Sequence, residues 1–167
     1  MQLSELNACE PAAAGRSLLQ CCGSTRWTRL MTEARPFADL KTMIARGEAI
    51  WDSLDAGDWL EAFAAHPQIG AVADSRGWSG REQAGMADAG DGTRRRLAEA
   101  NAAYASRFGY IFIICATGKT AGEMLEALER RMQNDPDAEL GVAAGEQRRI
   151  LALRLAKLVA TEQVTTP

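Results

Sequence analysis

The sequence predicts an all-α fold, a single-domain helical bundle of about seven to nine helices that spans residues 1–167. Apolar residues recur at steps of three and four along most of the chain, which is the period of an amphipathic helix. No internal repeat, low-complexity tract or long Pro/Gly/Ser linker divides the chain, which favours one core. The segments with helical spacing are residues 12–22, 24–34, 37–55, 58–65, 93–107, 120–133 and 137–160.

Start and stop signals support several of these helices. Asp58 with Glu61, and Thr120 with Glu123, have the spacing of a capping box. In that arrangement the side chain of the first residue accepts a hydrogen bond from a first-turn amide. The carboxylate three residues later accepts one from the backbone amide of the first residue. Asn134-Asp135-Pro136 is expected to end one helix and to begin the next.

Two predicted helices carry a polar side chain on their apolar face. The shared face of the helix at 93–107 consists of Leu97, Asn101, Tyr104 and Phe108. The shared face of the last helix consists of Leu140, Ala144, Gln147, Leu151, Arg154 and Leu158. Asn101 and Arg154 are therefore expected to point inward.

Residues 108–115 interrupt the helical pattern. The run from Phe108 to Cys115 is rich in β-branched and aromatic residues, which favour a strand. No partner strand is visible elsewhere, so we expect a short, buried, extended or irregular segment between two helices. Repeated glycines interrupt residues 68–92, which we expect to form a long loop around a short helix.

Charge and composition exclude several classes of protein. The formal net charge is −3, and 25% of the residues are charged. A nucleic-acid binder usually has a basic stripe, whereas the run Arg94-Arg95-Arg96 precedes Glu99 and indicates a solvated helix face. No run approaches the roughly 18 apolar residues of a membrane span, and no signal peptide is recognisable. We expect a cytoplasmic protein that binds neither nucleic acid nor membrane.

The cysteines give no sign of a metal site. Cys9, Cys21, Cys22 and Cys115 form no CxxC pair or zinc-like spacing, and the chain has one histidine. We expect reduced, buried thiols. A metal-dependent hydrolase is an alternative function, but one histidine with scattered acidic residues is a poor ligand set for it.

His66 is the first candidate for chemistry. Pro67 follows it, which prevents helix continuation and favours an extended backbone at His66. Imidazole titrates near neutrality and therefore suits proton transfer. A lone histidine is also commonly a helix cap or a core residue, so both roles stay open at this point.

Two other places could bind a small polar ligand. The run Ser79-Gly80-Arg81-Glu82-Gln83 brings a hydroxyl, a carboxylate and an amide within one helical turn. Ser79 and Glu82 also have capping-box spacing, and the two roles are compatible because a helix N-terminus offers free amides to an anion. Arg154 could clamp a carboxylate, or it could extend its guanidinium from the apolar face into water.

Several motifs occur in a fixed order along the chain. They are Arg35-Pro36-Phe37, His66-Pro67-Gln68-Ile69-Gly70, SGREQAG at 79–85, Asn101-x-x-Tyr104-x-x-Arg107-Phe108-Gly109-Tyr110-x-Phe112-Ile113-Ile114, and Leu153-Arg154-Leu155. Together they resemble the 2-oxo-4-hydroxy-4-carboxy-5-ureidoimidazoline (OHCU) decarboxylase family of uric acid degradation. The likeness extends over nearly the whole chain.

The resemblance implies an all-helical, homodimeric carboxy-lyase, a carbon–carbon lyase that converts OHCU to (S)-allantoin. It implies a small-molecule substrate and neither a metal nor an organic cofactor. Carried over to the matching positions, the catalytic residues are His66 for proton transfer and Glu82 as its partner. The substrate-binding residues are Pro67, Ser79, Gly80, Arg81, Gln83, Phe108, Gly109, Tyr110, Ile111, Phe112 and Arg154.

This reaction is chemically compatible with a site that lacks a cofactor. Loss of carbon dioxide leaves charge on a carbon conjugated with the imine and carbonyl groups of the ring, so the protein must orient the carboxylate, stabilise charge and deliver a proton. Unpaired N–H groups in an irregular segment at 108–112 suit the binding of substrate carbonyls. The alternative is a non-catalytic helical protein-interaction module, in which residues 108–114 form an exposed docking strip and His66 caps a helix.

Overall fold

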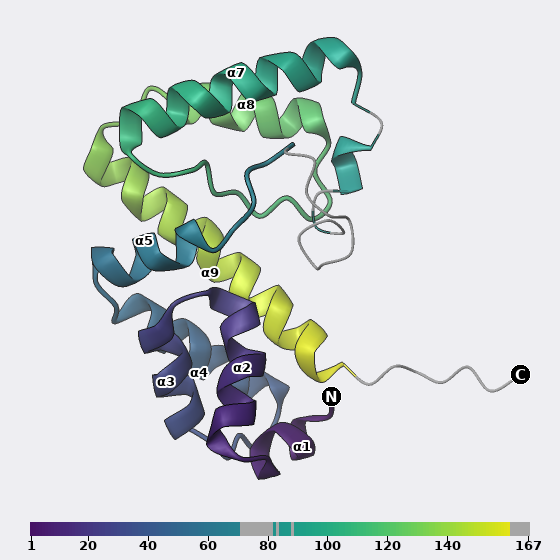
Figure 1. Ribbon diagram of the computed structural model, residues 1–167, viewed down its shortest axis with the longest axis vertical. Helices are drawn as coiled ribbons and strands as arrows, with labels where there is room; N and C mark the ends of the chain where they lie inside the picture. Colours follow the sequence, from purple (N-terminus) through teal and green to yellow (C-terminus); the bar gives the residue numbers. More distant parts are fainter. Residues whose placement is uncertain (71–81, 83, 88, 161–167) are drawn as a thin grey trace, which may run out of the picture. The chain divides into compact units, whose positions relative to one another are not determined.

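The computed structural model describes residues 1–70, 82, 84–87 and 89–160, and all regular elements in these ranges are helices (Figure 1). The elements are α1 (Leu3–Ala8), α2 (Pro11–Cys22), α3 (Thr25–Glu33), α4 (Leu40–Asp52), α5 (Ala56–Ala64), the 3₁₀-helix η1 (Ala84–Met86), α7 (Asp91–Phe108), α8 (Ala121–Arg131) and α9 (Pro136–Val159). The predicted all-α class is confirmed. Among these described helices, none combines the length and the apolar character of a membrane span.

The chain divides into two compact units. The terminal unit contains Met1–Trp59 and the described residues from Arg148 onward, and the central unit contains the described residues of Leu60–Gln147. α5 and α9 each contribute residues to both units. That residues 1–167 form one domain stays a prediction.

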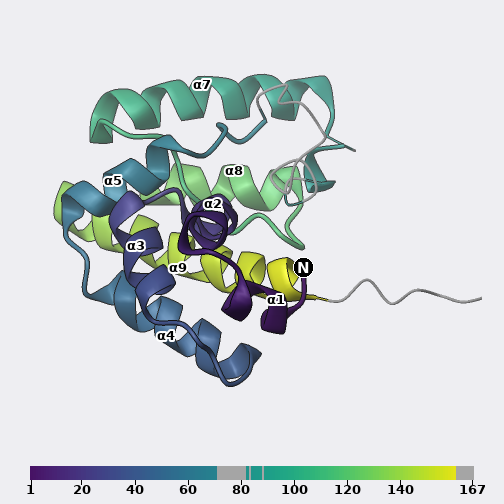
Figure 2. The ribbon, with the colours of Figure 1, turned by 60° about the horizontal axis from the view of Figure 1, so that its bottom comes forward.

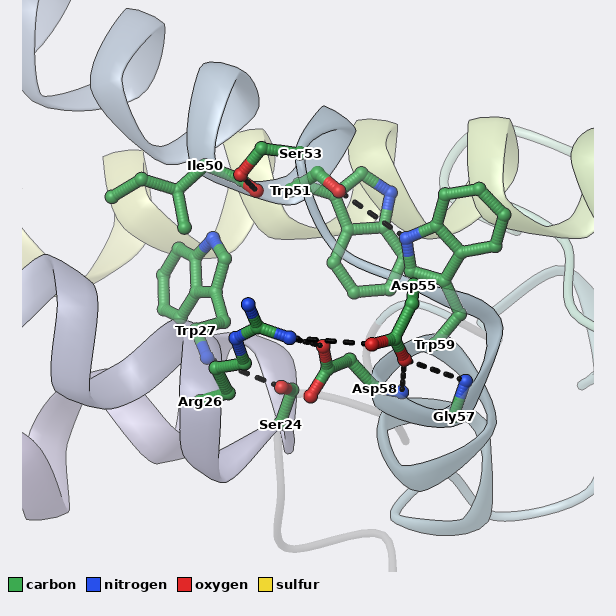
Figure 3. Close-up of polar contacts among 10 residues, drawn as sticks. All are labelled: Ser24, Arg26, Trp27, Ile50, Trp51, Ser53, Asp55, Gly57, Asp58 and Trp59. Atoms are coloured by element: carbon green, nitrogen blue, oxygen red, sulfur yellow. Dashed lines mark hydrogen bonds and ion pairs between the residues drawn. The ribbon is translucent and has the colours of Figure 1, made fainter.

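Two helix starts differ from the sequence prediction. α4 begins at Leu40 because the carboxylate of Asp39 accepts a hydrogen bond from the amide of Thr42 at 2.7 Å. α5 begins at Ala56, so the predicted capping box of Asp58 and Glu61 is wrong. Asp55 is the acceptor instead, because its Oδ1 lies 3.0 Å from the Gly57 amide and 3.2 Å from the Asp58 amide (Figure 3).

Two other local signals are confirmed. The Thr120 hydroxyl accepts from the Glu123 amide at 3.2 Å, and Glu123 Oε2 accepts from the Thr120 amide at 2.7 Å. The hydrogen bond from that amide, followed by the one from the hydroxyl, holds the pKa of Glu123 below its usual value. As predicted, α8 ends shortly before Asn134, and α9 begins at Pro136.

The terminal unit has an apolar core built around tryptophans, and in it α3 lies beside α2 and α4 (Figures 1 and 2). Trp27 and Trp51 are almost fully buried, and Trp27 Nε1 donates to the carbonyl of Gly47 at 2.9 Å. A Cβ added at Gly47 would lie 2.9 Å from Leu155 Cδ1 and 3.2 Å from Trp27 Cζ2. Gly47 therefore lets α4 pack closely against α3 and the end of α9.

The motif Arg35-Pro36-Phe37 has a structural role in this unit. The Asn7 side chain exchanges two hydrogen bonds of 2.9 Å with the backbone of Phe37. Arg35 donates to the carbonyl oxygens of Leu6 and Cys9 at 2.5 and 2.9 Å. These contacts hold α1, which the sequence pattern did not predict, against the chain that follows α3.

The central unit packs α7 against α8 around a second core. Leu97, Asn101 and Tyr104 are buried on one face of α7, as their spacing predicts. The same core contains Ile69 and also Met86 of η1. Parts of several sequence motifs therefore belong to one interior.

Candidate active site

His66 lies on a tight turn that follows α5. The amides of Ala65 and His66 donate to carbonyls three residues earlier, at 3.2 Å to Ala62 and 3.0 Å to Phe63. This 3₁₀-like turn ends the helix just before Pro67, and the His66 side chain is half-buried. The predicted position of His66 at a helix end is confirmed.

The residues after His66 are anchored from the opposite side. Ile69 is buried in the central core, and its carbonyl accepts a hydrogen bond from Asn101 Nδ2 at 2.9 Å. Gly70 has a φ of +76°, and a Cβ there would lie 3.3 Å from Met86 and 3.4 Å from Leu97. A residue other than glycine would be strained at this position. Residues 66–70, called the histidine turn from here on, are thereby fixed to α7 and η1.

The segment after α7 is irregular and buried, as the sequence predicts. Gly109 has a φ of +80° and ends α7 in the left-handed conformation. Residues 111–116 have no regular structure, and Phe112, Ile113 and Ile114 are buried. This burial contradicts the alternative in which the run forms an exposed docking strip.

Aromatic rings connect this irregular segment to the chain that precedes His66. The ring of Tyr104 lies 4.7 Å from Phe108, 5.9 Å from Tyr110 and 5.2 Å from Phe112, measured between centroids. The ring of Phe63 lies 5.4 Å from that of Tyr110. Because the carbonyl of Phe63 accepts from the amide of His66, the histidine turn begins beside the irregular segment.

A buried ion pair between α8 and α9 holds the irregular segment in place. Arg131 Nε and Glu139 Oε1 lie 2.8 Å apart, and both side chains are almost fully buried. Arg131 also donates to the carbonyl of Ile113 at 2.7 Å and stacks over the ring of Phe112 at 4.5 Å. The Tyr104 hydroxyl donates to Glu139. Burial, and then this hydrogen bond, raises the pKa of Tyr104, so the phenol stays a donor.

The far end of the segment is held by a second carboxylate. Glu146 Oε2 accepts from the amide of Cys115 at 2.8 Å. Burial raises the pKa of the Cys115 thiol, and the charges of Glu146 and then Glu82 raise it further. The charges of Glu146 and Glu82 therefore both disfavour the thiolate form of Cys115.

The turn that carries Glu82 is held by backbone contacts. A Cβ added at Gly85 would lie 1.9 Å from the carbonyl oxygen of Lys119, so no larger residue fits without backbone movement. Arg94 donates to the carbonyls of Met86 and Ala87, each at 3.0 Å. Close packing of two backbones thus explains Gly85, the last residue of the SGREQAG motif.

The remaining predicted site residues are not all placed. Ser79, Gly80, Arg81 and Gln83 lie outside the described residues, so their binding roles stay predictions. Arg154 belongs to the terminal unit, where it is 7% exposed and donates to the carbonyl of Gln20 at 3.4 Å. The guanidinium does not extend into water, which removes that alternative, and its role as a carboxylate clamp stays a prediction.

The sequence analysis missed the side chains that support the site. These are Arg131, Glu139 and Glu146. Arg131 and Glu146 form hydrogen bonds with the irregular segment, and Glu139 binds Arg131. A usable signal was present for Arg131, because it continues the buried stripe of Met124 and Leu128 on α8. The same reasoning had identified Arg154 on α9.

Within the described ranges, neither a cluster of metal ligands nor a disulfide is present. No group of three or more His, Cys, Asp or Glu side chains there is placed to hold a metal ion. The four cysteines are free, with Cys21 and Cys22 buried as predicted and Cys9 and Cys115 half-buried.

The chain is similar to known proteins over most of its length. The family model described as OHCU decarboxylase matches residues 7–156. The "Uric acid degradation bifunctional protein TTL" of Arabidopsis thaliana is 38% identical over 145 residues, which cover 83% of this chain and 45% of that protein. The human "Putative 2-oxo-4-hydroxy-4-carboxy-5-ureidoimidazoline decarboxylase" is 35% identical over 131 residues, which cover 75% of this chain and 76% of that protein.

Solved structures give the same result. A crystal structure of OHCU decarboxylase in the presence of (S)-allantoin has a TM-score of 0.79 and 39% identity, and the match covers 92% of this chain and 100% of that chain. A crystal structure of (S)-allantoin synthase has a TM-score of 0.74 over 96% of this chain and 55% of that chain. At 22% identity, the second match supports the fold alone.

Proposed function

The chain belongs to the OHCU decarboxylase family, and we propose that it is a carboxy-lyase that converts OHCU to (S)-allantoin in uric acid degradation. One observation carries this proposal beyond family membership. The histidine turn, the turn that carries Glu82 and the irregular segment after α7 belong to one unit and are joined by the contacts described above. Three of the five motifs that carry the family resemblance contribute residues to these places.

In the proposed reaction the bond between the ring carbon and the carboxylate breaks, and carbon dioxide leaves. The electron pair of that bond passes into the conjugated imine and carbonyl groups of the ring. A proton is then delivered to one face, which gives a single enantiomer of allantoin. We assign the proton transfer to His66, with Glu82 as the carboxylate that acts with it.

The irregular segment supplies a set of donors that suits this reaction. Among the hydrogen bonds of the described residues, none uses the backbone N–H of Tyr110, Ile111 or Phe112. Amides that are not used within the fold can donate to the ureido and ring carbonyls of a substrate, and fixed donors stabilise developing charge without reorganisation. The side chain of Phe112 is buried in the core, so its part in binding is assigned to the backbone.

The test compares three variants of the purified protein. Freshly generated OHCU is added, and the appearance of (S)-allantoin is followed by circular dichroism. His66→Ala and Glu82→Gln are each expected to lower kcat by roughly 100-fold or more while the protein keeps its melting temperature. Arg95→Ala, on an exposed position of α7, is the matched control and should keep full turnover. Near-normal turnover by a folded His66→Ala protein would contradict the mechanism.

We further propose that Arg154 binds the substrate carboxylate, because its planar guanidinium matches a carboxylate and its side chain is buried. Arg154→Ala should then raise KM more than it lowers kcat, and Arg154→Lys should restore part of the affinity. An unchanged KM in Arg154→Ala means that the residue only stabilises the fold.

The assembly and the location of the protein are also proposals. The family resemblance supports a homodimer, which sedimentation equilibrium of the purified chain would test. Four free cysteines support a cytoplasmic location, because thiols persist in reducing compartments. Fluorescence microscopy of a tagged chain, with tags at either end, would test that location.

A further inference from the structure

The first part of one sequence motif has no role in the reaction proposed above. In the motif Asn101-x-x-Tyr104-x-x-Arg107, the side chain of Tyr104 binds Glu139 and that of Arg107 donates to the carbonyl of Asn134 at 3.0 Å. Both of these contacts support the irregular segment or the turn between α8 and α9. Asn101 differs from them because its contact reaches the histidine turn.

We propose that Asn101 is a positioning residue that holds His66 in its catalytic geometry through the carbonyl of Ile69. This inference rests on the proposed function, since it assigns to Asn101 an effect on the proton transfer of His66. It concerns a residue that touches neither the substrate nor the reacting atoms.

The contact is short, buried and long-range in sequence. Asn101 is 1% exposed and Ile69 is 7% exposed, and Asn101 Nδ2 lies 2.9 Å from the Ile69 carbonyl oxygen. Hydrogen bonds thus hold the histidine turn near both of its ends. The amide of His66 bonds to Phe63 on the α5 side, and the carbonyl of Ile69 bonds to α7.

Asparagine at position 101 lowers the stability of the fold relative to an apolar residue. Its Oδ1 is buried and has no hydrogen-bond partner among the described residues. A buried acceptor without a partner lowers the stability of a fold, and an apolar residue of similar size would avoid that cost. The contribution that only asparagine makes at this position is the Nδ2 donor to Ile69.

The backbone geometry explains why such a donor matters. Gly70, directly after Ile69, has a positive φ, and a Cβ added there would lie 3.3 Å from Met86 and 3.4 Å from Leu97. A rotation of the Ile69 peptide would change the direction of the chain between His66 and Gly70. Because proton transfer requires alignment to within a fraction of an ångström, loss of the Asn101 bond is expected to reduce turnover more than binding.

The test uses Asn101→Leu and Asn101→Asp in the full chain. Leucine removes the donor and the unpaired acceptor together, whereas aspartate keeps the shape and removes the donor. Each variant is expected to lower kcat roughly 10- to 100-fold, with KM changed by less than about threefold. Arg107→Gln is the matched control, because it removes the motif's other donor to a backbone carbonyl and should leave kcat unchanged.

A second measurement does not depend on activity. His66 is the only histidine, so its ring signals in an NMR spectrum need no assignment. We expect those signals to shift and broaden in Asn101→Leu and to stay unchanged in Arg107→Gln. This readout tests the position of the ring directly, and a purely structural role of Asn101 elsewhere in the core would not move it.

The outcomes separate this inference from the proposed function. If the wild type is active and His66→Ala is inactive, but either folded Asn101 variant has wild-type kcat, the positioning role is overturned and the function stands. If Arg107→Gln lowers kcat as much as Asn101→Leu, general damage to α7 explains the loss and the inference is also overturned. If His66→Ala keeps full turnover, the proposed mechanism fails, and the NMR signals still decide whether Asn101 positions the ring.

Discussion

The terminal unit buries tryptophans in an apolar core, whereas the central unit buries an ion pair. In the terminal unit, Trp27 donates to the carbonyl of Gly47, and the buried guanidinium of Arg154 donates to the carbonyl of Gln20. In the central unit, Arg131 and Glu139 are both almost fully buried and are joined by the hydroxyl of Tyr104. The same chain thus contains two kinds of interior.

The difference follows from the backbone that each interior must support. A regular helix satisfies its own N–H and C=O groups between its ends, so the helices of the terminal unit need little more than apolar packing. Residues 111–116 have no such partners within the segment. The guanidinium of Arg131 and the carboxylate of Glu146 supply two of them, at Ile113 and Cys115. In the central unit, buried charges thus hold irregular backbone in place.

The strongest test of this comparison is to remove one ion. Arg131→Met leaves the carboxylate of Glu139 buried without its cation and the carbonyl of Ile113 without its donor. The free energy of unfolding, measured in urea, should fall by about 3–5 kcal/mol. The double variant Arg131→Met/Glu139→Leu should recover much of this stability but not the turnover. A loss below about 1 kcal/mol in the single variant would show that the pair is not important for the fold.

A second test adds one methyl group in the central unit. Gly85→Ala places a Cβ where the carbonyl of Lys119 already lies, so the backbone of the turn after Glu82 must move. We expect kcat/KM to fall by roughly tenfold or more, because Glu82 moves with the turn. The melting temperature and the steady-state rate are measured on the same sample. Full activity in Gly85→Ala would mean that Glu82 tolerates displacement.

The matched change in the terminal unit is Gly47→Ala. Its Cβ would meet the side chains of Leu155 and Trp27, at 2.9 and 3.2 Å, instead of backbone. Crowding of a packed core costs about 1–3 kcal/mol, and alanine regains about 1 kcal/mol of helix propensity. A net loss of roughly 1 kcal/mol is therefore expected in urea unfolding, with kcat unchanged. A selective loss of kcat in Gly47→Ala would contradict the separation between the two units.

The smallest effect is expected at an exposed helix cap. The folded-state pKa of Glu123 lies below its usual value, so its contribution to stability is present above the unfolded pKa and is lost as the pH falls through the folded pKa. Glu123→Gln should therefore lower the melting temperature at pH 7 and have little effect once the pH is below the folded-state pKa of Glu123. Equal melting temperatures of the variant and the wild type at pH 7 would mean that the cap does not stabilise α8.

Local patterns in the sequence predicted much of the fold. Apolar spacing located α2, α3, α5, α7, α8 and α9 to within a few residues, and the Thr120 capping box is present as predicted. The box expected at Asp58 failed for a local reason. Asp55, three residues earlier, also has a carboxylate in reach of first-turn amides, and spacing alone does not distinguish the two.

For the site, the sequence by itself determined where the helix before His66 stops, where the helical pattern breaks after Phe108, and which family the ordered motifs resemble. These features depend on neighbours within a few residues, so local patterns record them. Only the tertiary structure decided that Asn101 holds the histidine turn and that Glu139 joins Tyr104 to Arg131. The partners in the first contact are 32 residues apart, and Tyr104 and Glu139 are 35 residues apart. A buried donor must find an acceptor, but chain folding alone determines which distant acceptor comes within reach.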